Sequence, residues 1–213
     1  MLFRSNTAPR RLDQTDTLAR VPAIAMGWKM PKRGSPDHVP MAVLSDVLVA
    51  GDASRLYLGL VKGRELLLQA SGGMNWPLGD PLDFDGPTLF TLFALYKPNA
   101  SADTIVAAVE EEIAKIANDG VSEAELARVK TKMLSDYYSN LDAFISRADT
   151  IAKTQAMWGD ANVVNKVPGW IDAVTSADVQ RVAKTYFTPA NRSVIDRKPA
   201  PPAAEKPAAA PAK

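Results

Sequence analysis

The feature that most restricts the fold is the order in which short apolar strands and amphipathic helices follow one another along the chain. Strand-length apolar runs occupy about residues 23–30, 66–72, 88–96 and 192–196. Helical spacing of apolar residues marks about 37–49, 52–63, 101–120, 122–141, 144–158 and 176–187, with a short helix after residue 161. The order β-α-α-β-β-α-α-α-α-β predicts an α+β domain in which a helical layer covers a mostly antiparallel sheet.

Polar residues at the starts of these helices predict how the helices are capped. Asp37, Asp52 and Ser176 each precede an apolar stripe and are expected to be N-caps. Ser122 and Glu125 have the spacing of a capping box, in which each side chain bonds the other residue's backbone N–H. The helix boundaries therefore have a local chemical cause.

The composition divides the chain into three parts. Residues 1–20 are polar and nearly patternless, and we expect a flexible lead-in derived from an interdomain linker. Residues 21–197 carry the strands and helices and form the predicted domain. Residues 198–213 are almost all Pro, Ala, Lys and Glu, a composition typical of a disordered tail. No run approaches the ~18 to 20 apolar residues of a membrane span.

Charge and residue counts exclude several classes of function. Lys plus Arg total 25 against 24 for Asp plus Glu, so the net charge near +1 gives no electrostatic basis for binding nucleic acid. The sequence has no cysteine and one histidine, whereas most zinc sites use at least two His or Cys ligands. That histidine, His38, lies in a polar stretch before a helix, and we expect it to be a solvated helix-start residue.

Two acidic groups have to be considered as metal ligands. The run 110–112 is three consecutive glutamates inside a predicted helix, where successive side chains point in different directions, so we expect a solvated face. Asp80, Asp83 and Asp85 depart from the D-x-[DN]-x-[DN]-G calcium pattern and lack its terminal Glu, so we expect an acidic turn.

Three large apolar residues flank that acidic turn. Met74, Trp76 and Phe84 either form an exposed recognition patch or pack back onto the sheet. Packing is the commoner outcome for such a loop, and the sequence leaves both alternatives open.

Four segments carry a resemblance to a known family. They are 51–66 (GDASRLYLGLVKGREL), 93–99 (FALYKPN), 120–126 (GVSEAEL) and 174–187 (VTSADVQRVAKTYF). In this order and spacing they resemble the C-terminal, non-zinc-binding domain of the insulinase/pitrilysin family of zinc metallopeptidases, the inverzincins, whose fold is the LuxS/MPP-like metallohydrolase domain. The resemblance covers about residues 21–197.

The resemblance implies a non-catalytic role beside a zinc-binding domain. In such peptidases one domain supplies an H-x-x-E-H helix and a distal Glu that bind zinc, and related domains complete a chamber for an extended peptide. This chain has no H-x-x-E-H, so no cofactor is expected in it. Zinc is expected in a partner domain, which lies upstream in the same full-length chain or on a heterodimer partner, and peptide substrate is the other expected partner.

The resemblance also identifies contact candidates. Many relatives carry an Arg and, seven residues later, a Tyr that contact substrate and stabilise the oxyanion. Val61 and Leu68 occupy these positions here, and neither can donate a hydrogen bond from its side chain. The cations Arg55, Lys62 and Arg64 are the nearest candidates for substrate or interdomain contacts.

Two functions follow from the resemblance. The first is the C-terminal domain of a zinc peptidase, inactive alone and forming part of the peptide-binding chamber. The alternative is a catalytically inactive structural or assembly subunit, like the core proteins of the respiratory bc complex. Relatives with Ala/Pro/Lys tails and no cysteine are often exported, which favours the periplasm.

Overall fold

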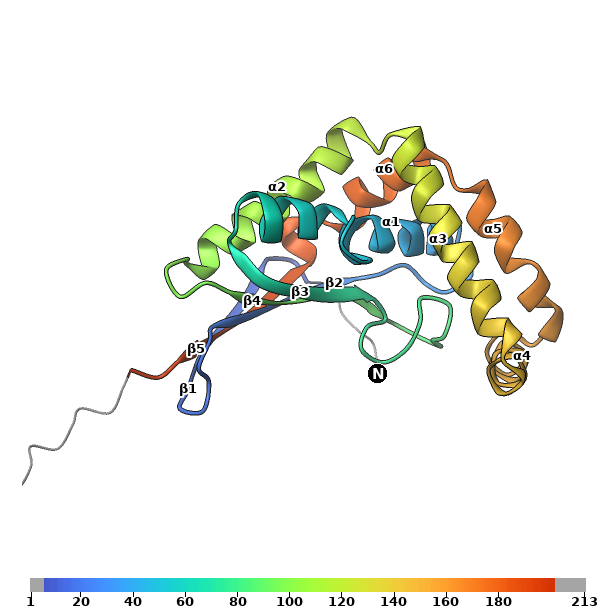
Figure 1. The fold of residues 1–213 in the computed structure, drawn as a ribbon, viewed down its shortest axis with the longest axis horizontal. Coiled ribbons are helices and arrows are strands. Elements are labelled where there is room, and N and C mark those ends of the chain that lie inside the picture. The colour runs from blue at the N-terminus through green and yellow to red at the C-terminus, as the bar shows by residue number, and fades with distance from the viewer. Residues whose placement is uncertain (1–5, 202–213) are drawn as a thin grey trace, which may run out of the picture.

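A five-stranded sheet lies at the centre of the computed structural model, which describes residues 6–201. Its strands are β1 (Arg10–Asp16), β2 (Ala23–Lys29), β3 (Leu67–Met74), β4 (Leu89–Tyr96) and β5 (Arg192–Pro199). They lie in the order β1-β5-β2-β4-β3, and only the β1–β5 pair is parallel (Figure 1). The predicted α+β class with a mostly antiparallel sheet is confirmed.

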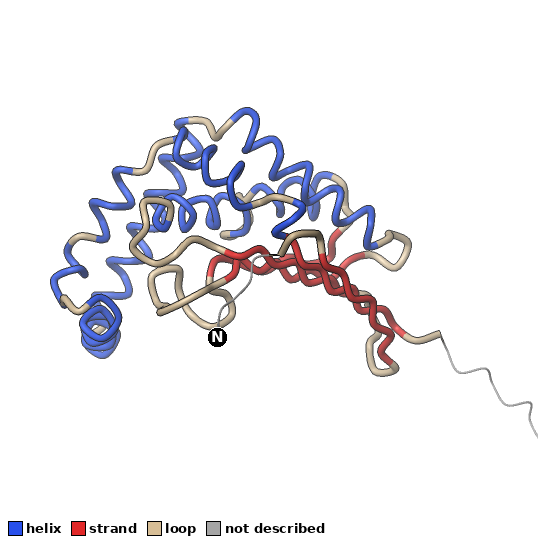
Figure 2. Tube along the Cα trace, turned by 180° about the vertical axis from the view of Figure 1, so that it is seen from behind, coloured by secondary structure: helices blue, strands red, loops and turns tan. Residues whose placement is uncertain are grey.

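Helices cover one face of the sheet and leave the other face open (Figure 2). The covering layer includes α1 (His38–Val49), α2 (Ala102–Asp119) and α6 (Ser176–Tyr186). Along β2, the side chains of Ile24, Met26 and Trp28 are buried, while the residues between them are partly exposed from Ala25 onward. This period of two directs one set of side chains into the core and the other onto the open face.

Aromatic rings fix the centre of the core between sheet and helices. The Trp28 ring lies 6.0 Å from the Phe90 ring and 5.1 Å from the Phe187 ring, measured between centroids. Leu44 of α1 and Val109 of α2 are fully buried against the same cluster. Burying each large apolar side chain contributes about 1.5 to 3 kcal/mol, so this packing holds the helical layer on the sheet.

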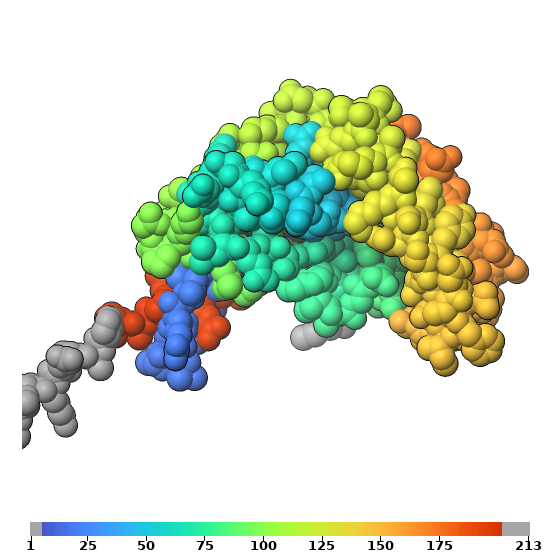
Figure 3. All heavy atoms as spheres, viewed as in Figure 1, coloured from blue at the N-terminus to red at the C-terminus, as the bar shows by residue number. Residues whose placement is uncertain are grey.

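Four further elements form the projecting end of the molecule (Figure 3). They are α3 (Glu123–Asp142), α4 (Phe144–Trp158), the 3₁₀ turn η2 (Ala161–Asn165) and α5 (Val167–Ala173). A small apolar cluster of Val163, Val167 and Ile171 holds them together, and α4 contributes no buried residue. Within residues 6–201, no helix is both long enough and apolar enough to cross a bilayer.

The lead-in predicted for residues 1–20 is wrong over residues 10–16, which form β1. The strand runs parallel to β5, with Arg11 opposite Val194 and Leu12 opposite Ile195. Nearly every β1 residue is exposed, so its sequence carries no alternation of apolar and polar residues that would mark a strand. Residues 198 and 199 of the predicted tail belong to β5, and residues 202–213 lie outside the described part.

The predicted caps of α3 and α6 differ from those in the structure. The Ser122 hydroxyl accepts from the Glu125 backbone N–H as predicted, but the Glu125 carboxylate binds Arg55 instead of completing a capping box. Thr175, not Ser176, caps α6 and forms a capping box with Asp178. Ser176 instead donates its hydroxyl to the Val121 carbonyl at 2.6 Å, so tertiary contacts decide both cases.

Neither of the other two predicted caps, Asp37 and Asp52, makes the predicted side-chain bond to the start of its helix. Asp37 occupies the cap position of α1, but its carboxylate accepts from Arg181 and from the Tyr186 hydroxyl. The helix predicted after Asp52 is a single π-helical segment, η1 (Tyr57–Gly63). The Arg64 N–H donates to the Gly59 carbonyl across five residues, the wider turn of a π-helix.

Candidate functional site: the open sheet face and its pocket

An apolar row crosses the open face of the sheet. Phe93 on β4 lies opposite Ser71 on β3 and Ala25 on β2, and Ala25 lies opposite Ile195 on β5. Leu12 on β1 completes the row beside Ile195, and these two side chains are 50% and 44% exposed. Residues opposite one another share a face, so β1, β5, β2 and β4 together present a partly exposed apolar band, which ends at Ser71 on β3.

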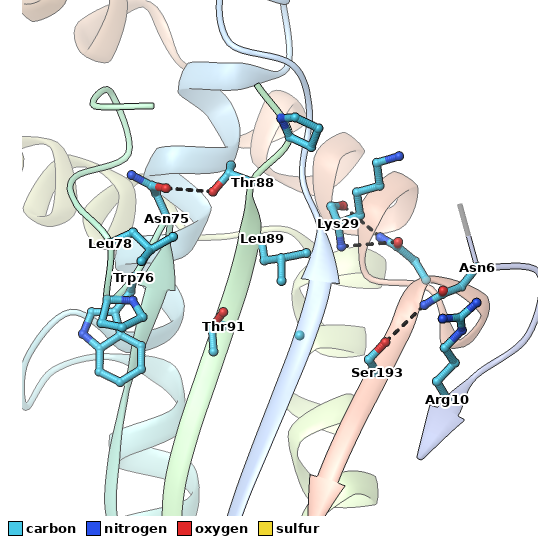
Figure 4. A pocket seen from close by; sticks show the side chains of 14 residues that line it. Asn6, Arg10, Lys29, Asn75, Trp76, Leu78, Thr88, Leu89, Thr91 and Ser193 are labelled. Carbon is cyan, nitrogen blue, oxygen red and sulfur yellow. Dashed lines mark hydrogen bonds between the residues drawn. The ribbon is translucent and has the colours of Figure 1, made fainter. Parts of the chain in front are cut away.

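A cavity of about 570 Å³ lies at one end of this face. Its floor includes Gly27 on β2 and Leu89 and Thr91 on β4. Trp76 and Leu78 lie on one side of the cavity, and Asn6, Arg10 and Ser193 lie on the other (Figure 4). The cavity therefore joins segments from both ends of the chain with the loop between β3 and β4.

Asn75 organises that loop. Its side-chain amide donates to the carbonyls of Asp80 and Asp83 at 3.1 Å each, and its side-chain oxygen accepts from the Thr88 hydroxyl at 2.9 Å. Asn75 has a positive φ of 64°, a conformation that Asn adopts more readily than most residues. These bonds hold the neighbouring Trp76 in place as one wall of the cavity.

The predicted solvated position of His38 is wrong, because its side chain is fully buried. Its Nε2 lies 2.8 Å from the Pro81 carbonyl, and its Nδ1 lies 3.4 Å from the Gly34 N–H. Burial lowers the pKa of His38, which favours a neutral ring that donates to Pro81 and accepts from Gly34. The loop between β3 and β4 folds over this side chain, so His38 fastens the loop.

Of the three large apolar residues that flank the acidic turn, Met74 and Phe84 pack into the core, whereas Trp76 stays accessible. Met74 and Phe84 are 1% and 7% exposed, and the Phe84 ring meets the His38 ring edge to face at 5.3 Å. Trp76 is 36% exposed and lines the cavity. The loop thus contributes both a core anchor and an accessible ring.

Two of the predicted contact cations are held by ion pairs within the domain. Arg55 binds both carboxylate oxygens of Glu125 at 2.7 and 2.6 Å, which raises the pKa of the guanidinium. Arg64 binds Glu111 on α2, so the structure fastens the two ends of η1 to different helices. The Lys62 ammonium lies 5.8 Å above the Tyr57 ring and is exposed.

Val61 and Leu68, which stand at the Arg and Tyr positions of relatives, occupy different environments. Val61 is half-buried against the main core. Leu68 is 49% exposed and lies at an irregularity in the pairing of β3 with β4, on the edge strand of the sheet. Contact roles for these two residues and the three cations stay predictions.

Most acidic residues of the run 110–112 and of the acidic turn form ion pairs within the domain. The expectation of a solvated face is wrong for Glu112, whose side chain is buried and bonds Lys115 at 2.7 Å, while Glu110 pairs with Arg192. In the acidic turn, Asp83 pairs with Lys153 and Asp85 with Arg33, both at 2.9 Å. Within residues 6–201, no three His, Cys, Asp or Glu side chains converge as metal ligands.

A second cavity, of about 1130 Å³, separates α4 from α1, α3 and α5 in the helical layer. Asp46 of α1 lines it, and burial raises the pKa of this carboxyl group to about 6. Lys132 lowers that pKa, while Asp136 and Asp80 raise it. The residues around this cavity are of mixed charge.

The cavity on the open face was not predicted from the sequence. The signal lies in β2, where the small residues Ala25 and Gly27 alternate with large buried ones. Small residues at the outward positions leave a depression where neighbouring strands carry larger side chains. Arg10 could not be found this way, because its strand was not predicted.

The fold and the site define an α+β domain with one open sheet face and no zinc-ligating group in the described residues. Residues 4–133, more than half of the chain, match the family described as the peptidase M16 inactive domain. The chain belongs to this family, and the resemblance stated from the sequence is confirmed. The match includes β1, which places that strand inside the domain.

The chain is also similar in sequence or in fold to zinc proteases and to inactive peptidase domains. The zinc protease PqqE of Helicobacter pylori is 27% identical over 182 residues, which are 83% of this chain and 38% of that protein. A protease structure from Helicobacter pylori has a TM-score of 0.82 at 21% identity, covering 92% of this chain and 46% of that one. An inactive peptidase domain from Bordetella parapertussis has a TM-score of 0.71 at 22% identity, covering 83% and 91%. The chain thus spans less than half of the two Helicobacter pylori proteins it matches.

Proposed function

We propose that this domain is the non-catalytic half of a zinc peptidase and closes a peptide-binding chamber against a domain that carries H-x-x-E-H. That domain lies upstream in a longer chain or on a partner chain. The observation that carries the proposal is the open sheet face, whose apolar row from Leu12 to Phe93 has no covering layer among residues 6–201. Exposed apolar surface of this kind is typical of an interaction site.

The residues of this chain do not fit a zinc site. A zinc-hydrolase helix of the H-x-x-E-H type needs two histidines, and the whole sequence has one. That residue, His38, is buried and bonded to the loop. The chemistry of metal-activated water therefore has to come from the partner domain, while this domain supplies walls and closure contacts.

The segment from Arg55 through η1 to β3 is the proposed surface for the partner domain. Arg55 and Arg64 are held by Glu125 and Glu111, so this segment is a rigid support. Lys62 and Leu68 are two of its several exposed residues. A paired guanidinium keeps unused N–H donors, so the two arginines can also bind a partner while their ion pairs persist.

The experiment compares the chain alone with the chain co-expressed with the H-x-x-E-H domain encoded upstream in the same reading frame or in a neighbouring gene. The chain alone is expected not to cleave a quenched fluorescent peptide, with or without added zinc. The assembled pair is expected to cleave it, and a chelator should abolish the cleavage. Cleavage by the chain alone would contradict the proposal.

A variant of the open face tests where the peptide lies. Phe93→Glu places a charge in the apolar row and is expected to lower cleavage by the pair at least tenfold. Ala107→Glu adds the same charge on the exposed side of α2 and is the control, expected to leave cleavage unchanged. A pair that assembles and never cleaves any peptide would instead favour the assembly-subunit function.

A further inference from the structure

The cavity on the open face combines an apolar wall with two cations. Trp76, Leu78 and Leu89 are 36%, 89% and 50% exposed, so their apolar surface is accessible to a ligand. Among residues 6–201, Arg10 and Lys29 are the charged residues that line the cavity, and no acidic residue of this range lines it. A volume of about 570 Å³ falls within the range of small-ligand pockets, roughly 300 to 1,000 Å³.

Within the part of the chain that the structure describes, Arg10 has no carboxylate partner, unlike the neighbouring arginines Arg11 and Arg197. Arg11 binds Asp13 and Asp103, and Arg197 binds Asp16. Among residues 6–201, no side chain forms an ion pair or hydrogen bond with the Arg10 guanidinium. A guanidinium that faces an apolar cavity is complementary to a carboxylate, which it can bind through two parallel hydrogen bonds.

The sheet topology excludes binding by strand addition at the floor of this cavity. Its floor is formed by β2 and β4, and each of these strands already has a neighbour on both sides. Main-chain hydrogen bonds of a bound peptide would need a free strand edge, which β2 and β4 lack. The cavity floor can therefore bind a ligand only through the ligand's side chains and its charged group.

The spacing of the strands sets the size of the ligand. Three inter-strand intervals of about 4.8 Å separate β4 from β1, roughly 14 Å in total. The Arg10 side chain lies beside Asn6 and Ser193, on the side of the cavity opposite Trp76 (Figure 4). An extended peptide advances about 3.3 Å per residue, so an apolar side chain and a carboxylate one to three residues apart can reach both walls.

We propose that this cavity binds a peptide segment in which a bulky apolar side chain against Trp76 and Leu89 is followed within a few residues by a carboxylate bound to Arg10. The carboxylate belongs to an Asp or Glu side chain or to the peptide's C-terminus. The proposal rests on the proposed function, since it requires a peptide to reach the open face. It adds a preference for an acidic or C-terminal segment, because the Arg10 guanidinium attracts a carboxylate.

Gly27 offers a way to block the cavity without disturbing the strand. A Cβ at this position would lie 3.9 Å from Leu89 Cδ1 and from the Phe90 carbonyl, which is ordinary van der Waals contact. Gly27→Val is therefore expected to fold, because a β-branched residue suits a strand, and to fill the floor of the cavity. Arg10→Gln removes the charge and keeps a hydrogen-bonding side chain at an exposed strand position.

The test is titration of the ¹⁵N-labelled chain with short peptides, followed by NMR. The acidic probe is acetyl-Gly-Phe-Gly-Asp-Gly-amide, and its neutral match carries Asn in place of Asp. A third probe, acetyl-Gly-Phe-Gly-Gly, has a free C-terminal carboxylate, and its C-terminal amide is the neutral match. A probe with a carboxylate is expected to shift the amides of the lining residues and to bind about tenfold more tightly than its neutral match.

The variants separate the two parts of the pocket. Arg10→Gln is expected to make a carboxylate probe and its neutral match bind equally, and Gly27→Val is expected to abolish binding of both. Arg197→Gln, which removes a cation of β5 outside the cavity, should bind like the unaltered chain. Circular dichroism and the NMR spectrum of each variant report whether it folds.

Three results would each overturn the proposal. The first is the absence of saturable shifts at the lining residues with every probe. The second is a carboxylate preference that survives in Arg10→Gln, and the third is binding that survives in Gly27→Val. Preference for the Asp probe or for the free C-terminus assigns the source of the carboxylate. Cleavage by the assembled pair is measured separately, so the pocket and the proposed function can fail independently.

Discussion

At the scale of one residue, Asp46 is a carboxyl group whose burial in the helical layer makes the folded state less stable when the group is charged. It lies on α1 beside the large cavity, with Lys132 and Asp136 facing it from α3 and Asp80 from the loop. Burial disfavours the charged form and raises the pKa of the carboxyl group to about 6, against about 3.9 for an unfolded chain. Between these values the folded state holds a proton that the unfolded state has released.

The first prediction concerns Asp46→Asn. Because the unaltered chain binds more protons folded than unfolded between about pH 4 and 6, its free energy of unfolding should fall, relative to the variant, as pH rises through that window. Above about pH 6 the variant should be more stable by up to about 2 kcal/mol, and near pH 4 the two should be similar. Urea unfolding at several pH values measures this, and a difference that does not change with pH would contradict it.

His38 shows the limit of sequence reasoning at this scale. Its neighbours Ser35 and Asp37 are polar, which predicts a solvated position. Its burial depends on Pro81 and Phe84, more than forty residues later in the sequence, folding over it. Such long-range packing leaves no mark in the local pattern, whereas the Ser122 hydroxyl cap, which is local, was predicted correctly.

At the scale of elements, β1 is the strand that local patterns could not reveal. Its side chains are almost all exposed, and what fixes it is its parallel pairing with β5. The apolar side chain of Leu12 meets Ile195 on the open face, while Arg11 reaches Asp103 at the start of α2. A strand that is held by pairing and not by burial has no amphipathic period, so composition assigned it to a linker.

The second prediction tests whether β1 pairs in solution. Leu12→Pro removes a backbone N–H from the middle of the strand and is expected to lower the free energy of unfolding by about 1 to 3 kcal/mol and to expose amides of β5 to hydrogen exchange. Leu12→Thr is the matched control, because it removes the apolar side chain but keeps the N–H and a strand-favouring residue. Equal stability and equal exchange in the two variants would mean that the Leu12 N–H takes no part in pairing β1 with β5.

At the scale of the whole molecule, the class of fold was predictable and the site was not. The apolar run Leu89–Tyr96 has the length of a strand, and the apolar residues of α2 repeat with the helical period, so the layers follow from the sequence. The cavity depends instead on sheet order, which brings Arg10 and Ser193 from opposite ends of the chain side by side. No local pattern encodes that neighbourhood.

The buried apolar residues of the described chain form two clusters of unequal size. The main cluster joins the sheet to α1, α2 and α6, with residues such as Leu44 fully buried. The second cluster holds only Val163, Val167 and Ile171, and α4 beside it buries no residue. A region with few buried apolar contacts opens at a lower free energy than the rest of a domain.

The third prediction is therefore that α4, η2 and α5 exchange their amide hydrogens through a local opening, while β2, β4 and α1 exchange only by global unfolding. Val163→Ala should lower the opening free energy of the projecting end by about 1 to 2 kcal/mol and leave the protection of β2 nearly unchanged. Leu44→Ala should lower the protection of every element by about 2 to 5 kcal/mol, because it opens a cavity in the shared core. Hydrogen exchange of native protein at increasing urea concentration measures both. If Val163→Ala reduced the protection of β2 and α4 equally, the two clusters would form one cooperative unit, and the projecting end could not rearrange against a partner without unfolding the sheet.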